Sequence, residues 1–196
     1  MTEQELPEFI PNPKMPRLRR QCVITEKIDG TNAQIYVGED GIVLAGSRNR
    51  WITPEKDNFG FARWVKEHDE ELRRLGPGRH YGEWWGQGVQ RRYGLTEKRF
   101  SLFNTGRWSA EPGEGQCRPP ACCHVVPVLY HGVFSTWAVD SSVELLEMNG
   151  SYAADGFMDP EGVVVYLAAA RQCFKVTLKN DEVPKSLAPA VFQKED

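Results

Sequence analysis

The sequence EKIDGTN, residues 26–32, decides how this chain of 196 residues is interpreted. The β-rich run that begins at Cys22 ends in this stretch at the turn Asp29-Gly30. A lysine at the end of a strand can direct its amine toward a ligand, and a glycine shortly after it lets the ligand approach the backbone closely. The pattern K-x-D-G is short, however, and it equally describes a surface lysine that enters a hairpin turn.

The flanking residues predict short strands and one helix. Residues 22–28, 33–37 and 42–45 suit three strands joined by tight turns, which indicates an antiparallel meander. Asp57 suits the N-cap of a helix that Gly76-Pro77-Gly78 ends. The apolar and aromatic residues of that helix recur at helical spacing: Phe61, Trp64, Val65, His68, Leu72 and Leu75. Further along, we expect strands at 100–103 and 125–130, a long loop at 104–122, and a helix at 141–148 capped by Asp140 or Ser141.

Two late segments combine charge with strand-forming residues. Residues 161–166, EGVVVY, place an acid and a glycine at the start of a buried strand, and residues 174–179, FKVTLK, place lysines in another. A lysine that opens a buried strand is unfavourable unless it meets an anion. Lys175 and Lys179 are an even number of residues apart, so both can face one side of the sheet. For Lys179, an edge-strand lysine with its amine in water is an equally good interpretation.

A third segment, YGEWWGQG at residues 81–88, sets Glu83 among glycines and aromatic residues. A carboxylate in such a setting is a candidate ligand for hydroxyl groups. The alternative is an ordinary strand followed by a turn, with the paired tryptophans in the core.

Composition limits the function classes. The net charge of −3 excludes a strongly basic nucleic-acid binder, so any contact with RNA needs a local basic surface. No secretory leader and no apolar run near 18 residues is present, so we expect a soluble, cytoplasmic protein that does not enter a membrane. The five cysteines are irregularly spaced, which favours reduced thiols. Four residues form a C-x4-C-C-H pattern that matches no firm zinc spacing: Cys117, Cys122, Cys123 and His124.

Taken together, six segments give a specific resemblance. KIDGTN, SRNR, YGEWWG, FSLF, EGVVVY and FKVTLK, in this order, resemble the motifs of the covalent nucleotidyltransferase superfamily of polynucleotide ligases and capping enzymes. Glu26 before the lysine and Thr31-Asn32 after the glycine are similar to the RNA-ligase branch. The resemblance extends from about residue 14 to residue 185.

The resemblance implies an α+β fold, an ATP-grasp-like nucleotidyltransferase domain in which antiparallel sheets are flanked by helices and the nucleotide lies in the cleft between them. It implies one domain over residues 1–196, with an extended N-terminal lead-in at 1–20. About twenty residues follow Lys175, too few for the C-terminal oligonucleotide-binding (OB) barrel of DNA ligases and capping enzymes. Sealing would then need a homodimer, an accessory RNA-binding partner, or only weak binding of RNA by this domain.

The activity implied by the resemblance is ATP-dependent RNA ligation with Mg²⁺ or Mn²⁺. Lys27 would attack the α-phosphate of ATP to form lysyl-AMP, AMP would pass to an RNA 5′-phosphate, and a 3′-hydroxyl would displace it. The remaining implied contacts are the ribose for Glu83, the adenine for Phe103, the divalent metal for Glu161, the α-phosphate for Lys175 and Lys179, the phosphate or the reacting end for Arg48, the 5′-phosphate for Asn32, and the edge of the adenosine site for Glu26.

The chemistry fits this assignment, because phosphoryl transfer depends on positioning and charge neutralisation and needs no glycine-rich phosphate loop. One departure is that Thr177 stands where the family commonly has a second lysine, so either Thr177 or Lys179 could make the second phosphate contact. Other interpretations are a small DNA ligase, an adenylation-only or GTP-using nucleotidyltransferase, and an inactive module that binds RNA ends. The intact charged residues argue against the last of these.

Overall fold

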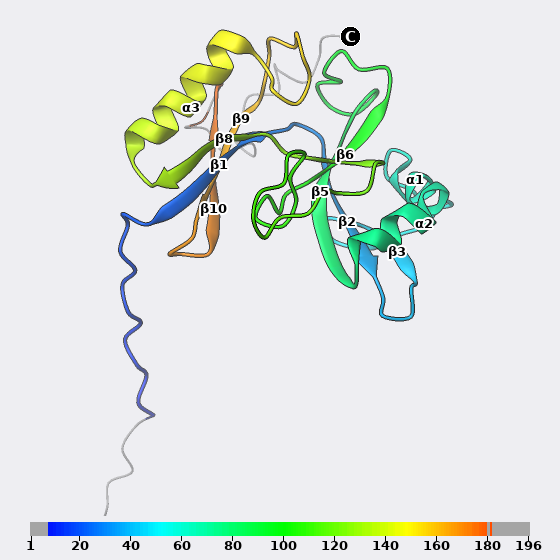
Figure 1. Ribbon diagram of the computed structural model, residues 1–196, viewed down its shortest axis with the longest axis horizontal. Coiled ribbons are helices and arrows are strands. Elements are labelled where there is room, and N and C mark those ends of the chain that lie inside the picture. The colour runs from blue at the N-terminus through cyan, green and yellow to red at the C-terminus, as the bar shows by residue number, and fades with distance from the viewer. Residues whose placement is uncertain (1–7, 180, 182–196) are drawn as a thin grey trace, which may run out of the picture.

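The computed structural model describes residues 8–179 and residue 181, which form an α+β fold with two sheets (Figure 1). The first seven residues of the predicted lead-in lie outside this range. Sheet A has the strand order β10-β9-β1-β8. Its strands are β1 (Gln21–Lys27), β8 (Val128–Val133), β9 (Gly162–Leu167) and β10 (Gln172–Thr177).

Sheet B has the strand order β4-β3-β2-β5-β6-β7. Its strands are β2 (Thr31–Val37), β3 (Val43–Ser47), β4 (Trp51–Ile52), β5 (Gly78–Gly86), β6 (Lys98–Leu102) and β7 (Cys123–Val125). The prediction of antiparallel sheets holds for every named pair except β6 with β7, which is parallel.

The predicted meander is wrong, because β1 belongs to sheet A whereas β2 and β3 belong to sheet B. Asp29 and Gly30 therefore carry the chain from one sheet to the other and do not close a hairpin. Gly30 lies so close to β5 that a Cβ there would overlap the carbonyl oxygen of Trp84 and the side chain of Trp85. The glycine of the opening motif is needed for this crossing.

The segment predicted as one helix is broken into three pieces: α1 (Phe61–Glu67), α2 (Asp69–Leu72) and the 3₁₀ helix η1 (Arg73–Leu75). His68, with φ −109°, interrupts the helical backbone between α1 and α2. The N-cap position is Gly60 and not Asp57. Asp57 nevertheless accepts hydrogen bonds from the backbone N–H groups of Ala62 at 2.8 Å and Arg63 at 3.2 Å, so it serves the helix start from a distance.

The later helix also begins earlier than predicted. It is α3 (Thr136–Asn149), and its N-cap is Ser135, whose Oγ accepts a hydrogen bond from the N–H of Ala138 at 3.1 Å. The predicted strand at 125–130 is divided between β7 in sheet B and β8 in sheet A. Between them, the carbonyl of Pro127 accepts a hydrogen bond from the backbone of Glu26 at 2.9 Å.

Three apolar cores hold the elements together. The first lies between sheet B and the α1–η1 segment, with Ile35, Phe61 and Leu72 fully buried. The second lies between sheet A and α3, and it contains Ile24 and Leu146. Figure 1 shows α3 on the outer side of sheet A, and α1 and α2 on the outer side of sheet B.

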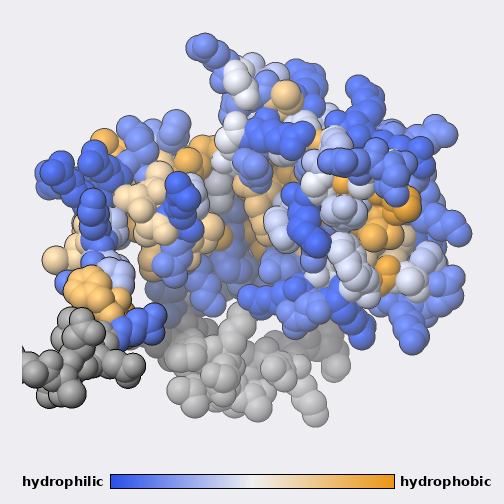
Figure 2. Space-filling view, turned by 90° about the horizontal axis from the view of Figure 1, so that it is seen from below, coloured by the Kyte–Doolittle hydropathy of each residue, from blue (hydrophilic) through white to orange (hydrophobic). Residues whose placement is uncertain are grey.

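The third core joins the two sheets. It contains Ile28 after β1, Trp85 at the end of β5, and Tyr93, Val126 and Ala154 from the connecting loops. Each sheet thus has a back face, packed on its helices, and a front face turned the other way. The surface seen in Figure 2 is mostly hydrophilic, with hydrophobic residues in small separate groups. In the part of the chain that the structure describes, no helix has the length and apolar character needed to span a membrane.

Candidate active site

The end of β1 pairs with the start of β9, and this pairing places Lys27 beside Glu161. Lys27 is in register with Gly162, so Glu161 lies just beyond the paired segment. The Lys27 Nζ donates to Glu161 Oε2 in an ion pair, and the Glu161 side chain is only 4% exposed. Gly162 has φ 151°, and a Cβ there would overlap the Val176 carbonyl oxygen of β10. A glycine is therefore needed at position 162 for the chain to bring the Glu161 carboxylate to the lysine.

Sheet B contributes Glu83 and Asn32, which face each other across β5 and β2. The Asn32 Nδ2 donates to Glu83 Oε2 at 2.8 Å. Burial raises the pKa of the Glu83 carboxyl from 4.5 to about 7, although the hydrogen bond from Asn32 and the charge of Lys27 act to lower it. The negative charge of Glu161 acts in the other direction. Glu83, Lys27 and Glu161 are thus close enough to influence one another's charge, although they come from three distant parts of the sequence.

Strand β10 carries Lys175 on the front face of sheet A. Lys175 pairs with Val164, which in turn pairs with Thr25, two residues before Lys27. Cross-strand partners share a face, as do residues two apart along a strand, so Lys175, Val164 and Lys27 all lie on the front. Lys175 is exposed, and within residues 8–179 and 181 its amine forms no ion pair.

Thr177 and Lys179 occupy different settings. Thr177 pairs with Gly162, the partner of Lys27, so it lies in the same cross-strand row as the lysine. Its hydroxyl donates to the Lys179 carbonyl at 3.0 Å. The Lys179 amine, whose side chain is 68% exposed, donates to Asp159 Oδ1 at 2.8 Å.

Glu26 lies on the back face of sheet A, because neighbouring residues of a strand point to opposite sides. It is buried, and its carboxylate accepts hydrogen bonds from the loop after α3: from Ser151 Oγ at 2.5 Å and from the N–H groups of Tyr152 at 2.8 Å and Ala153 at 2.9 Å. Burial raises the pKa of this carboxyl, and these hydrogen bonds oppose the shift. The Glu26 carboxylate is therefore separated by the sheet from the amine of Lys27.

Two further predicted residues lie at the margins. Phe103 follows β6, is 41% exposed, and donates its backbone N–H to the carbonyl of Tyr81 at 3.0 Å, so it continues the front face of sheet B. Arg48 lies in the turn between β3 and β4, and its side chain is exposed.

A network of hydrogen bonds and ion pairs, which the sequence did not indicate, stabilises the crossing between the two sheets. Arg91 donates to Asp29 Oδ2 at 3.0 Å and to Asp159 Oδ2 at 2.7 Å, and Asp159 also accepts from Lys179. The hydroxyl of Tyr93 accepts a hydrogen bond from the Asp29 N–H at 2.7 Å. Arg91 and Tyr93 belong to the irregular loop after β5, where no short motif marks them. The network ties that loop, the turn after Lys27 and the end of β10 together.

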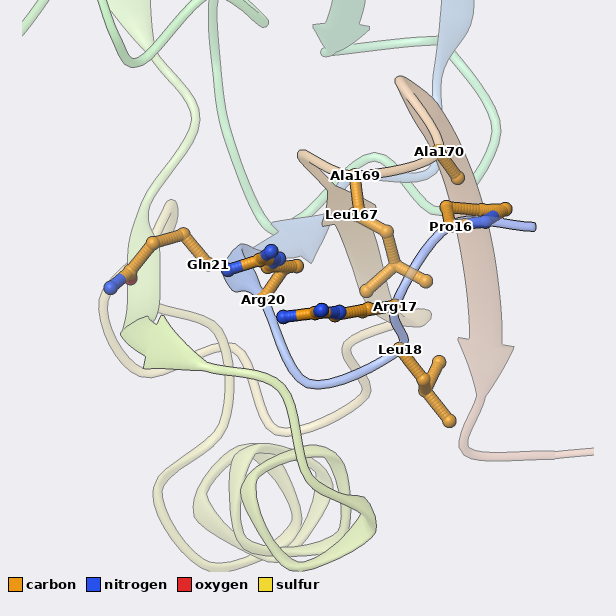
Figure 3. Close-up of a pocket in the computed structure, with 8 residues that line it drawn as sticks. All are labelled: Pro16, Arg17, Leu18, Arg20, Gln21, Leu167, Ala169 and Ala170. Atoms are coloured by element: carbon orange, nitrogen blue, oxygen red, sulfur yellow. The ribbon is translucent and has the colours of Figure 1, made fainter. Parts of the chain in front are cut away.

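The remaining features lie apart from the site around Lys27, Glu161 and Glu83. In the described residues, no three His, Cys, Asp or Glu side chains are grouped so that they could hold a metal ion by themselves. Cys122 and Cys123 have their Sγ atoms 3.9 Å apart, and His124 is exposed. Figure 3 shows a pocket between the N-terminal lead-in and the β9–β10 turn, lined by residues that include Arg17, Gln21 and Leu167 and none of the predicted site residues.

The described site can now be compared with known proteins. The family model for RNA ligase matches residues 20–179, most of the chain and all of the site. The chain belongs to the RNA ligase family. This confirms the resemblance found in the six sequence segments. No curated protein matches the chain.

Solved structures of Naegleria gruberi RNA ligase are similar in fold. An apo mutant superimposes with a TM-score of 0.53 at 19% identity, covering 88% of this chain and 57% of that one. A mutant with ATP and Mn gives a TM-score of 0.53 at 18% identity and covers 83% and 50% of the two chains. A mutant with AMP and Mn gives 0.51 at 18% identity, with coverage of 88% and 57%. The chain therefore shares the fold and spans about half the length of these relatives.

Proposed function

We propose that this member of the RNA ligase family is an ATP-dependent ligase that joins RNA 3′-hydroxyl and 5′-phosphate ends through a lysyl-AMP intermediate. The observation that supports this most directly is the meeting of Lys27, Glu161 and Glu83 at the junction of the two sheets. A nucleophilic amine, a buried carboxylate beside it and a second carboxylate on the facing sheet are the groups that covalent nucleotidyl transfer needs.

In the first step the Lys27 ammonium gives a proton to water, and the neutral Nζ attacks the α-phosphorus of ATP while a second proton leaves to solvent. A phosphorus–nitrogen bond forms, the bond to the bridging oxygen breaks, and pyrophosphate leaves. Glu161 holds the amine in place before the nucleotide arrives. Lys175, which has no paired carboxylate among the described residues, offsets the negative charge of the α-phosphate oxygens.

The next two steps complete the joining. An oxygen of the RNA 5′-phosphate attacks the adenylate phosphorus, and the bond to Lys27 breaks. The 3′-hydroxyl of the second end then attacks the 5′-phosphorus and releases AMP. Asn32 and Arg48 are assigned to the 5′-phosphate, because Asn32 is exposed beside Glu83 and Arg48 extends from the neighbouring turn.

On the nucleoside side, the Glu83 carboxylate would accept hydrogen bonds from the ribose hydroxyls, and Phe103 would stack on the adenine. Val164 lies on the front face of sheet A by register, and we add it as an apolar contact for the base. Glu26 is assigned a supporting role, since its carboxylate holds the loop after α3. The nucleotide would thus lie between the front faces of the two sheets, as in an ATP-grasp-like arrangement within a single domain.

Glu161 suits a Mg²⁺ or Mn²⁺ ion. Mg²⁺ commonly keeps several waters and is bound by one or two carboxylates together with substrate phosphates, so a single buried carboxylate next to the triphosphate site fits this donor set. A cation bound there would neutralise charge on the phosphate oxygens. Because Lys27 now donates to this carboxylate, Glu161 would have to release the amine in order to hold such an ion. RNA capture would rest on this domain, on a second copy of it, or on an accessory partner.

The test is to incubate the protein with α-labelled ATP and Mg²⁺ or Mn²⁺ and to measure acid-stable label on the chain. We expect labelling of the natural protein, none of Lys27→Ala, and normal labelling of Lys66→Ala, which removes an exposed lysine on α1. Equal labelling of Lys27→Ala would defeat the assignment.

Ligation assays separate the alternatives. Sealing of 5′-phosphate RNA but not of the matching DNA supports an RNA ligase, and the reverse supports a small DNA ligase. Label without sealing of either indicates an adenylation-only enzyme, and RNA binding without label indicates an inactive module.

A further inference from the structure

Beyond Glu83 and Asn32, the front face of sheet B continues as an open surface of aromatic residues around one arginine. We define the aromatic face as Tyr36 of β2, Trp51 of β4, and Arg79 and Tyr81 of β5. The register places Tyr36 opposite Arg79, and Tyr81 lies two residues before Glu83 on the same strand. Trp51 pairs with Gly46, and Gly46 with Gln34, which shares the face of Tyr36.

Two of the three aromatic side chains are exposed, and Tyr36 is half-buried. Trp51 is 47% exposed and Tyr81 is 53% exposed. The Arg79 guanidinium lies 5.3 Å from the ring centre of Tyr36 and 5.2 Å from that of Trp51. The two rings meet edge to face at 6.2 Å. The arginine therefore orders a group of rings whose remaining surface is open to a ligand.

Three arginines lie on this face or beside it. Arg79 lies within it, and Arg48 and Arg50 lie in the turn that leads into Trp51. This combination arises locally in a chain whose net charge is −3. The phosphate backbone of a nucleic acid would gain directly from these three arginines.

We propose that the aromatic face binds single-stranded RNA next to the reacting end, with bases stacked on Trp51 and Tyr81 and phosphates near Arg79. This inference rests on the proposed function for the identity of the polymer. Exposed aromatic side chains on a sheet, beside cations, suit unpaired bases because every base offers a flat face for stacking. Tyr81 and Glu83 are about 7 Å apart along the strand, roughly the span of one extended nucleotide step, so the strand would run from the aromatic face to the proposed adenylate.

The test measures RNA binding and adenylation separately. A 5′-phosphorylated 12-nucleotide RNA with a 3′ fluorophore is titrated with the protein, and its anisotropy gives the dissociation constant. We expect Trp51→Ala and Tyr81→Ala each to weaken binding about 5- to 50-fold, as expected for loss of one stacked base. Trp51→Phe keeps a ring and should recover most of the affinity. Arg79→Ala should also weaken binding, and should reduce its dependence on salt.

Matched measurements keep the result interpretable. Trp137→Ala removes a tryptophan that is 70% exposed on α3, away from this face, and should bind RNA normally. All variants should form the Lys27 adduct with ATP within about twofold of the natural protein, which also shows that they fold. Duplex RNA of the same sequence should bind more weakly than the single strand.

Three outcomes would overturn the inference. One is that Trp51→Ala and Tyr81→Ala bind RNA no worse than Trp137→Ala. Another is that the natural protein forms the adduct but has no measurable affinity for the single strand. The third is that sedimentation shows a dimer lost in Trp51→Ala with RNA affinity unchanged, which would assign the face to a second copy. If the adduct fails to form but Trp51→Ala still weakens RNA binding, the proposed ligase fails while this surface stands.

Discussion

The two sheets meet at one site but bring different chemistry to it. Sheet A supplies charges in contact, the Lys27–Glu161 ion pair, with Lys175 on the same face. Sheet B supplies Glu83, whose hydrogen-bond partner is the neutral amide of Asn32 and whose pKa is therefore left near 7 by burial. The carboxylate beside sheet A has a cation in contact, whereas burial raises the pKa of the carboxyl in sheet B. In the proposed function, sheet A would therefore contact the phosphates and sheet B the nucleoside.

The largest expected effect comes from removing the negative charge of Glu161 beside sheet A. Glu161→Gln removes the charge beside Lys27 and the proposed metal ligand, while it keeps nearly the same shape. We expect adduct formation with ATP to fall on the order of 10³-fold, about 4 kcal/mol of transition-state stabilisation. Rapid-quench labelling measures the rate. Glu147→Gln, an exposed change on α3, is the control, and similar rates for the two variants would contradict the division between the sheets.

The second test concerns Glu26 on the back face of sheet A, where its carboxylate stabilises the fold. Glu26→Ala removes the buried carboxylate that accepts hydrogen bonds from Ser151, Tyr152 and Ala153. We expect a loss of about 3 kcal/mol in the free energy of unfolding. Urea titration measures it, with Glu147→Ala as an exposed control. The folded fraction at low temperature should still form the adduct, and a stable Glu26→Ala protein without adduct would place this carboxylate in the nucleotide site after all.

Glu26 and Lys27 also show what sequence can and cannot establish. The motif order predicted the family, but it placed Glu26 at the edge of the adenosine site, whereas the structure has its carboxylate on the back face of sheet A. Nothing local to residues 26–32 indicates that Asp29-Gly30 crosses between sheets, because that depends on how closely β5 packs against Gly30. The helix starts were missed for a similar reason: Ser135 and Asp57 act through hydrogen bonds whose geometry is fixed only in the folded chain. Arg91 and Asp159, 68 residues apart, meet only through tertiary packing.

Sheet B can be tested through the titration of Glu83. Its pKa in the folded protein lies above the ordinary value of 4.5, so between pH 4.5 and 7 the native state binds more protons than the unfolded state, and stability falls as pH rises. Glu83→Gln removes this titration. Between pH 5 and pH 7.5, the free energy of unfolding of Glu83→Gln should fall by about 2 kcal/mol less than that of the natural protein. Urea unfolding at the two pH values measures the difference. Parallel curves for the two proteins would show that folding does not raise the pKa of Glu83.

The smallest effect separates the lysines at the end of sheet A. Lys175 faces the front and pairs with no carboxylate in the part of the chain that the structure describes, so Lys175→Ala should slow adduct formation about 20-fold. Lys179 is mostly exposed and already paired with Asp159, and Lys179→Ala should slow it less than threefold, because an exposed ion pair contributes little. Thr177→Lys places a lysine in the row of Lys27. If Thr177→Lys raises the rate in the Lys179→Ala background, then position 177 is where the second phosphate contact can be made. A large loss from Lys179→Ala alone would instead mean that its amine leaves Asp159 when the nucleotide binds.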